Sequence, residues 1–276
     1  MASVCGQTHQ YLEVIVVDDG SVDDTYSIAE ALRASDPRIK VLRHERSRGA
    51  QAARNTGILN ALGVWVGFLD SDDVYLPNSI RWRLEVAERD RIGAVHSECT
   101  VLRGAGSRER LNTPPWHGDI RRQVLAYPGP TFPGLLVRRQ CLNAIGGLDE
   151  SIVAFQEWDT AIRLAFVTRF GFVPEPTFIW DQRGSDTISN DLRRSAAGYE
   201  QVVRKHVRSI VRHGGPRMLA GHFREAARQR RMADEQSSSM MREAVALVVW
   251  PPGVLAFGRK VIRRVIAAVR RPFAGG

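Results

Sequence analysis

The clearest pattern in the chain is an apolar run that ends in acidic residues, and it occurs twice. Residues 13–17 read EVIVV and lead directly into DDGS at 18–21. A β-branched run of this kind is typical of a strand buried on both faces, as in a parallel sheet. Residues 63–69, rich in Val, Trp and Phe, form a second run that ends in DSDD at 70–73. The sequence therefore predicts two strands followed by acidic turns.

Helical patterns alternate with these strands. We predict helices over 23–35 and 50–61, separated by a short strand at 39–43, and a further helix behind Pro77. This order is typical of an α/β fold with a Rossmann-like, mostly parallel sheet flanked by helices. In such sheets the chemistry lies just beyond the carboxyl ends of the strands, where both acidic turns fall.

The pattern is less regular after residue 93. We expect short strands near 94–96 and 134–137, and a Gly-, Pro- and Arg-rich loop over 104–119. Apolar spacing predicts a helix over 157–167, and the polar stretch 181–191 reads as a loop.

Charge is distributed unevenly along the chain. From residue 200 onward there are 16 Lys and Arg against 5 Asp and Glu, a net of +11, whereas the first 199 residues carry 23 against 25, a net of −2. A neutral body with a basic tail favours an anionic surface such as a membrane over nucleic acid. We therefore expect a main domain at 1–195 and a basic helical region at 196–276.

Two further features concern the compartment. The three cysteines, Cys5, Cys99 and Cys141, lie far apart and form no CxxC pair, which argues against a disulfide framework or a zinc site. The N-terminus lacks the basic start and apolar run of a secretory signal. We expect a cytoplasmic protein.

The segment 254–273 has the pattern of an amphipathic helix. Val261, Ile262 and Val265 fall on one face, and Lys260 and Arg264 on the other. One interpretation is a helix lying on the inner face of the plasma membrane. The other is a helix that packs on the protein's own body. The apolar run at 244–250 is too short to cross a bilayer, which takes roughly 20 residues.

The acidic turns are the first candidates for chemistry. Asp70, Asp72 and Asp73 place three carboxylates within four residues, where they repel one another unless a cation lies between them. Oxygen ligands of this kind suit Mg²⁺ or Mn²⁺ together with a substrate diphosphate. The alternative is a solvated turn that caps the next helix. Asp18 and Asp19 either terminate their strand or accept hydrogen bonds from a ribose or a base.

Glu157 is the candidate general base. It lies in the segment QEWD, at the start of a predicted helix. A carboxylate there can take the proton of a reacting hydroxyl. The alternative is that the acids of this first turn only balance the helix dipole.

Five segments together resemble family 2 glycosyltransferases, whose fold is called GT-A. They are LEVIVVDDGSVDDT at 12–25, RGAQAARNTGI at 48–58, VGFLDSDD at 66–73, GGLDES at 146–151 and QEWDTAIRLA at 156–165. They occur in the family's order, and the resemblance covers roughly residues 3–195. It implies an inverting transfer of a sugar from a nucleotide-diphosphate sugar to a hydroxyl acceptor, in polysaccharide or glycolipid synthesis. The implied partners are this donor and a glycan or lipid-linked acceptor, with Mn²⁺ or Mg²⁺ as cofactor and no nucleic acid.

The resemblance also implies roles for individual residues. Asp18 or Asp19 would touch the nucleoside, and Arg54 and Asn55 would line the nucleotide and sugar side. The remaining implied roles are the DxD element for Asp70 and Asp72, with Asp72 as direct metal ligand, the catalytic base for Glu157, and a contact over the diphosphate for Arg183. Where the family has a Glu-Asp pair this chain has Gln156-Glu157, so the basic carboxylate lies about one C–C bond farther out.

One family feature has no counterpart. The family begins with a strand of the SVIIPTYNR type, and the residues before Glu13 match only the end of the helix that follows it. We expect either a start codon placed too late or a fragment with impaired binding. The alternative function is a non-catalytic binding or scaffold protein on the same fold.

Overall fold

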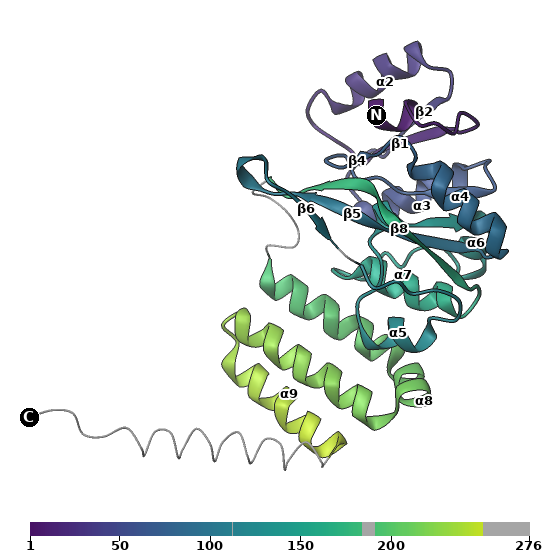
Figure 1. The fold of residues 1–276 in the computed structure, drawn as a ribbon. Coiled ribbons are helices and arrows are strands. Elements are labelled where there is room, and N and C mark those ends of the chain that lie inside the picture. The colour runs from purple at the N-terminus through teal and green to yellow at the C-terminus, as the bar shows by residue number, and fades with distance from the viewer. Residues whose placement is uncertain (112, 184–190, 251–276) are drawn as a thin grey trace, which may run out of the picture. The chain divides into compact units, whose positions relative to one another are not determined.

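The computed structural model describes residues 1–111, 113–183 and 191–250 (Figure 1). The chain divides into two compact units, Met1–Asp191 and Leu192–Gly276. This division falls four residues before the boundary expected from the sequence. The first unit carries all the strands of the described chain, and the second is helical wherever it is described.

The first unit opens with a short helix, α1 (Ala2–Cys5), and a small parallel sheet. Strand β1 (Val14–Asp18) pairs in parallel with β2 (Ile39–Arg43), and the connecting helix is α2 (Thr25–Ser35). Helix α3 (Ala50–Asn60) follows and packs against β1. Apart from α1, for which no range was predicted, each of these elements lies within two residues of its predicted range.

A separate six-stranded sheet forms the rest of the unit. Its strand order is β3-β7-β5-β8-β4, with β6 pairing with β5. The strands are β3 (Trp65–Gly67), β4 (Val74–Tyr75), β5 (Ala94–Leu102), β6 (Arg108–Leu111), β7 (Leu136–Arg138) and β8 (Phe170–Asp181). The helices are α4 (Ser79–Asp90), α5 (Arg121–Ala126), α6 (Arg139–Ala144) and α7 (Gln156–Ala165), with single 3₁₀ turns at Gly104–Gly106 and Phe132–Gly134.

The pairing is mixed, which corrects the expectation of a mostly parallel sheet. Among the strands of the described residues, β1–β2 and β5–β8 pair in parallel, and the other four pairings are antiparallel. Antiparallel partners need only a short connection, and the turn at Gly104–Gly106 supplies one between β5 and β6. Apolar periodicity identifies a strand but does not encode its direction.

The structure differs from the sequence analysis at two other places, for local reasons. The predicted loop at 104–119 contains β6, whose four residues are all exposed and therefore carry no buried apolar pattern. The long strand β8 was not predicted, because Pro174 and Pro176 interrupt it. The register of β5 against β8 shifts around Glu98, opposite these prolines. Such irregularities are where a sheet tolerates residues that lack an N–H group.

Strand β1 is also less buried than expected. Val14 and Asp18 are buried, but the three residues between them keep partial solvent access. The physical reason is that β1 pairs only with β2, in a sheet of two strands.

Two clusters of buried side chains anchor the larger sheet. One lies under α4 and consists of Val86, Ala87, Ile92, Val95 and Val173. The other lies near the far end of β8 and consists of Tyr75, Cys99, Val101 and Phe178. Figure 1 shows α4 and α7 on opposite sides of the sheet. Leu69, which directly precedes the acidic turn at 70–73, packs against the second cluster.

The second unit consists of α8 (Leu192–Met232) and α9 (Gln236–Val249). Gly215, at φ 73° and ψ −179°, divides α8 into two helices. Glu200 pairs with Arg230 at 2.9 Å and with Arg242 at 2.6 Å, which ties both halves of α8 to α9. Among the described residues, no helix has the length and apolar character needed to cross a membrane. The predicted helix at 254–273 lies outside the described residues, so its placement on a membrane stays a prediction.

Gly20 provides a test of the loop that follows β1. Its φ is +78°, and an added Cβ would lie 2.7 Å from the carbonyl carbon of Arg46 and 2.8 Å from the nitrogen of Ser47. Gly146 has a similar φ of +73° but open space around its Cα. We expect Gly146→Ala to lower the free energy of unfolding by about 1–2 kcal/mol, from backbone strain alone. Gly20→Ala should cost clearly more, because the backbone at 46–47 must also move. Urea denaturation measures both, and equal losses would contradict this account.

Candidate active site

The candidate site is built around the acidic turn that follows β3. The N–H of Asp73 donates to the carbonyl of Asp70 at 3.1 Å and closes the turn. The buried carboxylate of Asp73 accepts the N–H of Asp181 at 3.1 Å, which attaches the turn to the end of β8. Burial raises the pKa of Asp73 to about 7; the Asp181 N–H opposes this shift, and the charges of nearby carboxylates add to it. Asp73 is therefore a structural anchor, and Asp70 and Asp72 remain for ligands.

Arg54 neutralises Asp70. Its Nη2 donates to Asp70 Oδ1, and its Nη1 donates to Gln51 Oε1 at 2.8 Å. The guanidinium also lies 4.4 Å above the centroid of the Phe132 ring. These contacts hold the positively charged guanidinium of Arg54 beside the acidic turn, and they occupy only one of the two oxygens of Asp70.

Glu157 meets this pair from the first turn of α7. Burial raises its pKa above the ordinary value of 4.5. Its own N–H and the charge of Arg54 oppose this shift, whereas the charge of Asp70 adds to it. Glu157 therefore lies within electrostatic range of the Arg54–Asp70 pair. The helix begins after Phe155, which holds the left-handed conformation at φ 60° and ψ 33°. Such a conformation costs roughly 1–2 kcal/mol in a residue with a side chain.

Asp18 and Asp19, at the end of β1, have different surroundings. Asp18 is buried and accepts the N–H of Ser21 at 3.1 Å. Its second oxygen lies 3.0 Å from Arg43 Nε but lacks the alignment of a hydrogen bond, so this buried acceptor is still unsatisfied. The side chain of Asp18 is fully buried in this structure, so its contact with a nucleoside stays a prediction.

The carboxylate of Asp19 is instead engaged by the segment that leads into α3. It accepts hydrogen bonds from Ser47 Oγ and from the N–H groups of Arg48 and Gly49, at 2.7 to 3.0 Å, and lies 2.6 Å from Nδ1 of His44. Burial alone would raise its pKa, but these donors outweigh burial and hold the pKa at about 2. Asp19 therefore fixes the start of α3, and its contact with a nucleoside stays a prediction.

Asn55 is likewise occupied by protein. Its Nδ2 donates to the Leu148 carbonyl at 2.9 Å and to Glu150 Oε1 at 2.8 Å, and its Oδ1 accepts the Leu148 N–H at 2.8 Å. The predicted position beside the nucleotide and sugar stays a prediction. What the structure shows is a clamp between α3 and residues 148–150.

A second clamp on the same segment was missed. Arg163, on α7, donates to the carbonyls of Ile145 at 2.9 Å and Gly147 at 2.6 Å, and pairs with the buried Asp159 at 2.8 Å. The signal was present in the sequence, since Asp159 and Arg163 are four residues apart in a predicted helix. Residues 145–150 thus join the helix of Arg54 to the helix of Glu157.

Arg183 follows the end of β8, two residues after Asp181, whose N–H holds the acidic turn. It is exposed and pairs with its neighbour Asp181 at 2.5 Å, which lowers the pKa of Asp181 to about 2. The loop expected to fold over a diphosphate continues into residues 184–190, outside the described residues.

The residues at the turn suit a divalent metal held partly by substrate. Within the described ranges, no three His, Cys, Asp or Glu side chains are placed to hold a metal ion. Asp72 is exposed and has no hydrogen-bond or ion-pair partner there, and Asp70 keeps one oxygen outside its pair with Arg54. Mg²⁺ at phosphate sites is bound by one or two carboxylates plus the phosphates, so this pair fits.

Comparison with known proteins identifies the family. The sequence profile of glycosyl transferase family 2 matches residues 1–142, just over half of the 276 residues. The chain belongs to this family. The resemblance noted in the sequence is thereby confirmed, and three of its five segments lie within the family match.

Curated relatives agree with this assignment. An uncharacterised glycosyltransferase of Rickettsia conorii is 31% identical over 175 residues, covering 54% of this chain and 29% of the relative. The glucosyltransferase WfgD of Escherichia coli, named for UDP-Glc and α-D-GlcNAc-diphosphoundecaprenol, is 34% identical over 102 residues, which is 37% of this chain and 40% of WfgD. The match thus spans less than half of either relative.

Solved structures confirm the GT-A fold. TarS of Staphylococcus aureus (residues 1–349), in complex with UDP-GlcNAc, has a TM-score of 0.70 at 18% identity, covering 90% of this chain and 76% of that one. The mannosyltransferase PcManGT of Pyrobaculum calidifontis, in complex with GDP-Man and Mn²⁺, has a TM-score of 0.59 at 17% identity, covering 91% and 82%.

The clamp formed by Asn55 generates a prediction. We expect Asn55→Ala to accelerate amide hydrogen exchange at Leu148 and to lower the free energy of unfolding by about 2 kcal/mol, since three hydrogen bonds are lost. The matched control is Asn60→Ala, on the same helix, which should leave exchange at Leu148 unchanged. Exchange mass spectrometry measures the effect. If Asn55→Ala weakened nucleoside diphosphate binding without changing this exchange, Asn55 would be a ligand contact rather than a clamp.

Proposed function

We propose that the chain transfers a sugar from a nucleotide-diphosphate sugar to a hydroxyl group of a glycan or lipid-linked acceptor, with inversion at the sugar. The observation that carries the proposal is the ion pair of Arg54 and Asp70 at the acidic turn, which lies within electrostatic range of Glu157 on α7. Family membership and the complexes of TarS with UDP-GlcNAc and PcManGT with GDP-Man support the class of donor. The name of WfgD supports a lipid-linked acceptor.

In this proposal Glu157 is the general base. A base works best when its pKa approaches the working pH, and burial shifts the pKa of Glu157 upward in that direction. The acceptor oxygen attacks C1 of the sugar from the face opposite the diphosphate. The new C–O bond forms as the bond to the diphosphate breaks, and the hydroxyl proton passes to Glu157. One displacement completes the transfer, and no covalent enzyme intermediate is required.

The acidic turn serves the donor. Asp72, together with the second oxygen of Asp70, would hold a divalent cation. Such a cation, when bound, supplies positive charge to the leaving diphosphate. Asp73 keeps the turn attached to β8, and Arg54 holds Asp70 in place. The nucleoside would lie at the end of β1, near Asp18 and Asp19.

Asp72→Ala tests the metal assignment. The side chain is exposed and has no partner among the described residues, so the melting temperature should not change. We expect sugar transfer or hydrolysis with Mn²⁺ to fall at least ~100-fold, because a metal supplies several kcal/mol of charge stabilisation. The matched control is wild-type protein treated with EDTA, which the variant should resemble. Electron paramagnetic resonance should show weaker Mn²⁺ binding by the variant in the presence of UDP or GDP. Unchanged Mn²⁺ binding and turnover would rule out the assignment.

Substitutions at Glu157 test the base. We expect Glu157→Gln to lower turnover by about 100- to 10,000-fold while calorimetric titration with UDP and GDP stays unchanged. Glu157→Asp keeps a carboxylate and should retain part of the activity. A base must be ionised to act, so wild-type kcat/KM should fall as pH drops through the raised pKa of Glu157, above 4.5. Loss of nucleotide affinity with turnover preserved would make Glu157 a binding residue.

A further inference from the structure

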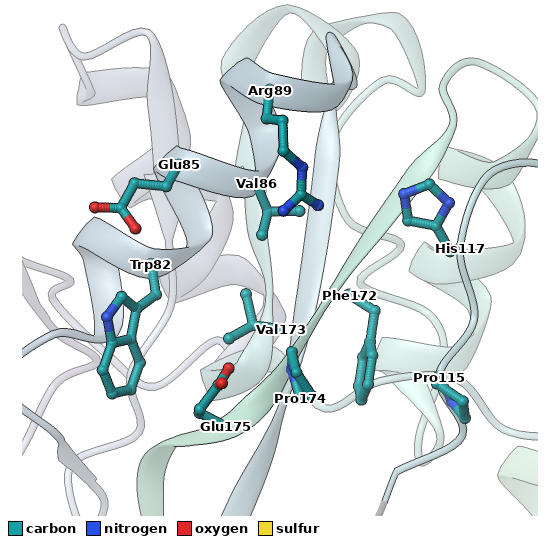
Figure 2. A pocket seen from close by; sticks show the side chains of 10 residues that line it. All are labelled: Trp82, Glu85, Val86, Arg89, Pro115, His117, Phe172, Val173, Pro174 and Glu175. Atoms are coloured by element: carbon teal, nitrogen blue, oxygen red, sulfur yellow. The ribbon is translucent and has the colours of Figure 1, made fainter.

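A second pocket lies in the first unit, away from the acidic turn (Figure 2). It has a volume of about 630 Å³ and lies between α4, the middle of β8 and the segment 115–117. Glu175, on its floor, precedes Asp181 by six residues of β8. A strand rises about 3.3 Å per residue, so the pocket lies roughly 20 Å from the end of β8 where the acidic turn is attached. It is therefore separate from the proposed donor site.

The walls of this pocket are divided about equally between apolar and polar surface. Trp82 from α4 and Phe172 from β8 supply aromatic faces, and Pro115 and Pro174 supply flat apolar surface. Trp82 also packs against the buried cluster under α4, which holds the indole in position. A pocket with such walls and a few convergent polar groups is the usual form of a small-ligand site.

The polar groups of the pocket include both acceptors and donors. In the view of Figure 2, the carboxylates of Glu85 and Glu175 lie on the side of the Trp82 indole, and the His117 ring lies on the opposite side. Arg89 supplies a guanidinium to the same opening. Glu175 is exposed and has no hydrogen-bond or ion-pair partner in the described part of the chain. Acceptors and donors thus line one opening around an aromatic face.

The donor side is held in place by the protein. Asp90 pairs with Arg89 at 2.8 Å and with His117 at 3.0 Å. The hydrogen bond from Arg89, followed by that from His117, holds the pKa of Asp90 far below its usual range. The residue after His117, Gly118, exchanges two backbone hydrogen bonds with Phe170, at 2.7 and 2.9 Å. The pocket wall is therefore preformed, which lowers the ordering cost of binding.

We propose that this pocket binds a neutral oligosaccharide. A sugar ring presents C–H groups on one face, which pack on the electron-rich face of an indole, and hydroxyls around its edge, which both donate and accept. Such a ligand matches a Trp82 face bordered by carboxylates and a guanidinium. Glu85 is paired with Arg81 at 3.2 Å and Arg89 with Asp90 at 2.8 Å, so the charge left over among the lining glutamates and arginine is that of Glu175, which disfavours a polyanion. A purely apolar peptide would leave the charged groups desolvated and unpaired.

The inference rests on the proposed function and extends it to the acceptor. A glycan held some 20 Å from the transfer site would raise the local concentration of its growing end there. The pocket would thus favour long acceptor chains over short ones.

Direct binding tests the proposal without reference to turnover. The probes are cellohexaose, maltohexaose and chitohexaose, each measured against the full chain by saturation-transfer NMR and by calorimetry. We expect at least one to bind saturably, and Trp82→Ala to weaken that binding at least tenfold. Glu175→Ala should weaken it about tenfold, since a hydrogen bond to a charged group is lost. Glu88→Ala, an exposed glutamate of the same helix outside the pocket, is the matched control and should bind as wild type.

The outcomes separate this proposal from the transferase proposal. Trp82 packs on the core, so thermal melts must accompany Trp82→Ala; Glu175→Ala keeps the test decisive if Trp82→Ala unfolds. The proposal is overturned if none of the three hexasaccharides binds, or if binding is equal in wild type and Glu175→Ala. Binding that depends on Glu175, in a protein without turnover of any sugar nucleotide, would support the pocket and contradict the transferase activity. Turnover of a sugar nucleotide without binding of any hexasaccharide would support the transferase activity and contradict the pocket proposal.

Discussion

Repulsion among the carboxylates of the turn at 70–73 is the constraint around which the site is arranged. The structure resolves it differently for each acid. Asp73 is buried and accepts the Asp181 N–H, and its burial raises its pKa. Asp70 is neutralised by Arg54, and Asp72 faces solvent. Only the last has no partner among the described residues. The same arrangement therefore stabilises the turn and leaves one carboxylate available for a cation.

The neutralisation of Asp70 depends in turn on how α3 and α7 are placed. Both helices form hydrogen bonds with the segment 145–150, α3 through Asn55 and α7 through Arg163. Arg54 is the neighbour of the first clamp, and Glu157 lies within two turns of the second. A shift of this segment would therefore change the relation of the base to the acidic turn. Asn55 and Arg163, which bond to protein groups, thus hold the two helices that carry the site residues Arg54 and Glu157.

Strand β8 organises the larger sheet and both proposed sites. Its far end holds the acidic turn through Asp181, and its middle forms the floor of the aromatic pocket. Pro174 lines that pocket at the point where the register of β5 against β8 shifts. The prolines that prevented the prediction of β8 thus lie at the proposed oligosaccharide pocket, and Pro174 forms part of its wall.

The sequence by itself determined the elements whose signal is local. The strands at 14–18 and 39–43, the helices around 50–60 and 156–165, and the acidic turns follow from apolar periodicity and from residues adjacent in the chain. The order of five short motifs was enough to indicate the family. Candidate residues such as Asp72 and Glu157 were identified because each carries its chemistry in its own side chain.

Only the tertiary structure decided the direction of the strands, the existence of β8, and which polar side chains are bonded to other protein groups. Strand direction depends on partners far away in the chain, and Pro174 and Pro176 are tolerated only because β5 offers an irregular register opposite them. Asp18 and Asp19 are adjacent and identical in type, yet one keeps an unsatisfied oxygen and the other is filled by donors from residues 44–49. Hydrogen-bond capacity is a property of the residue, but the partners that use it are supplied by the fold.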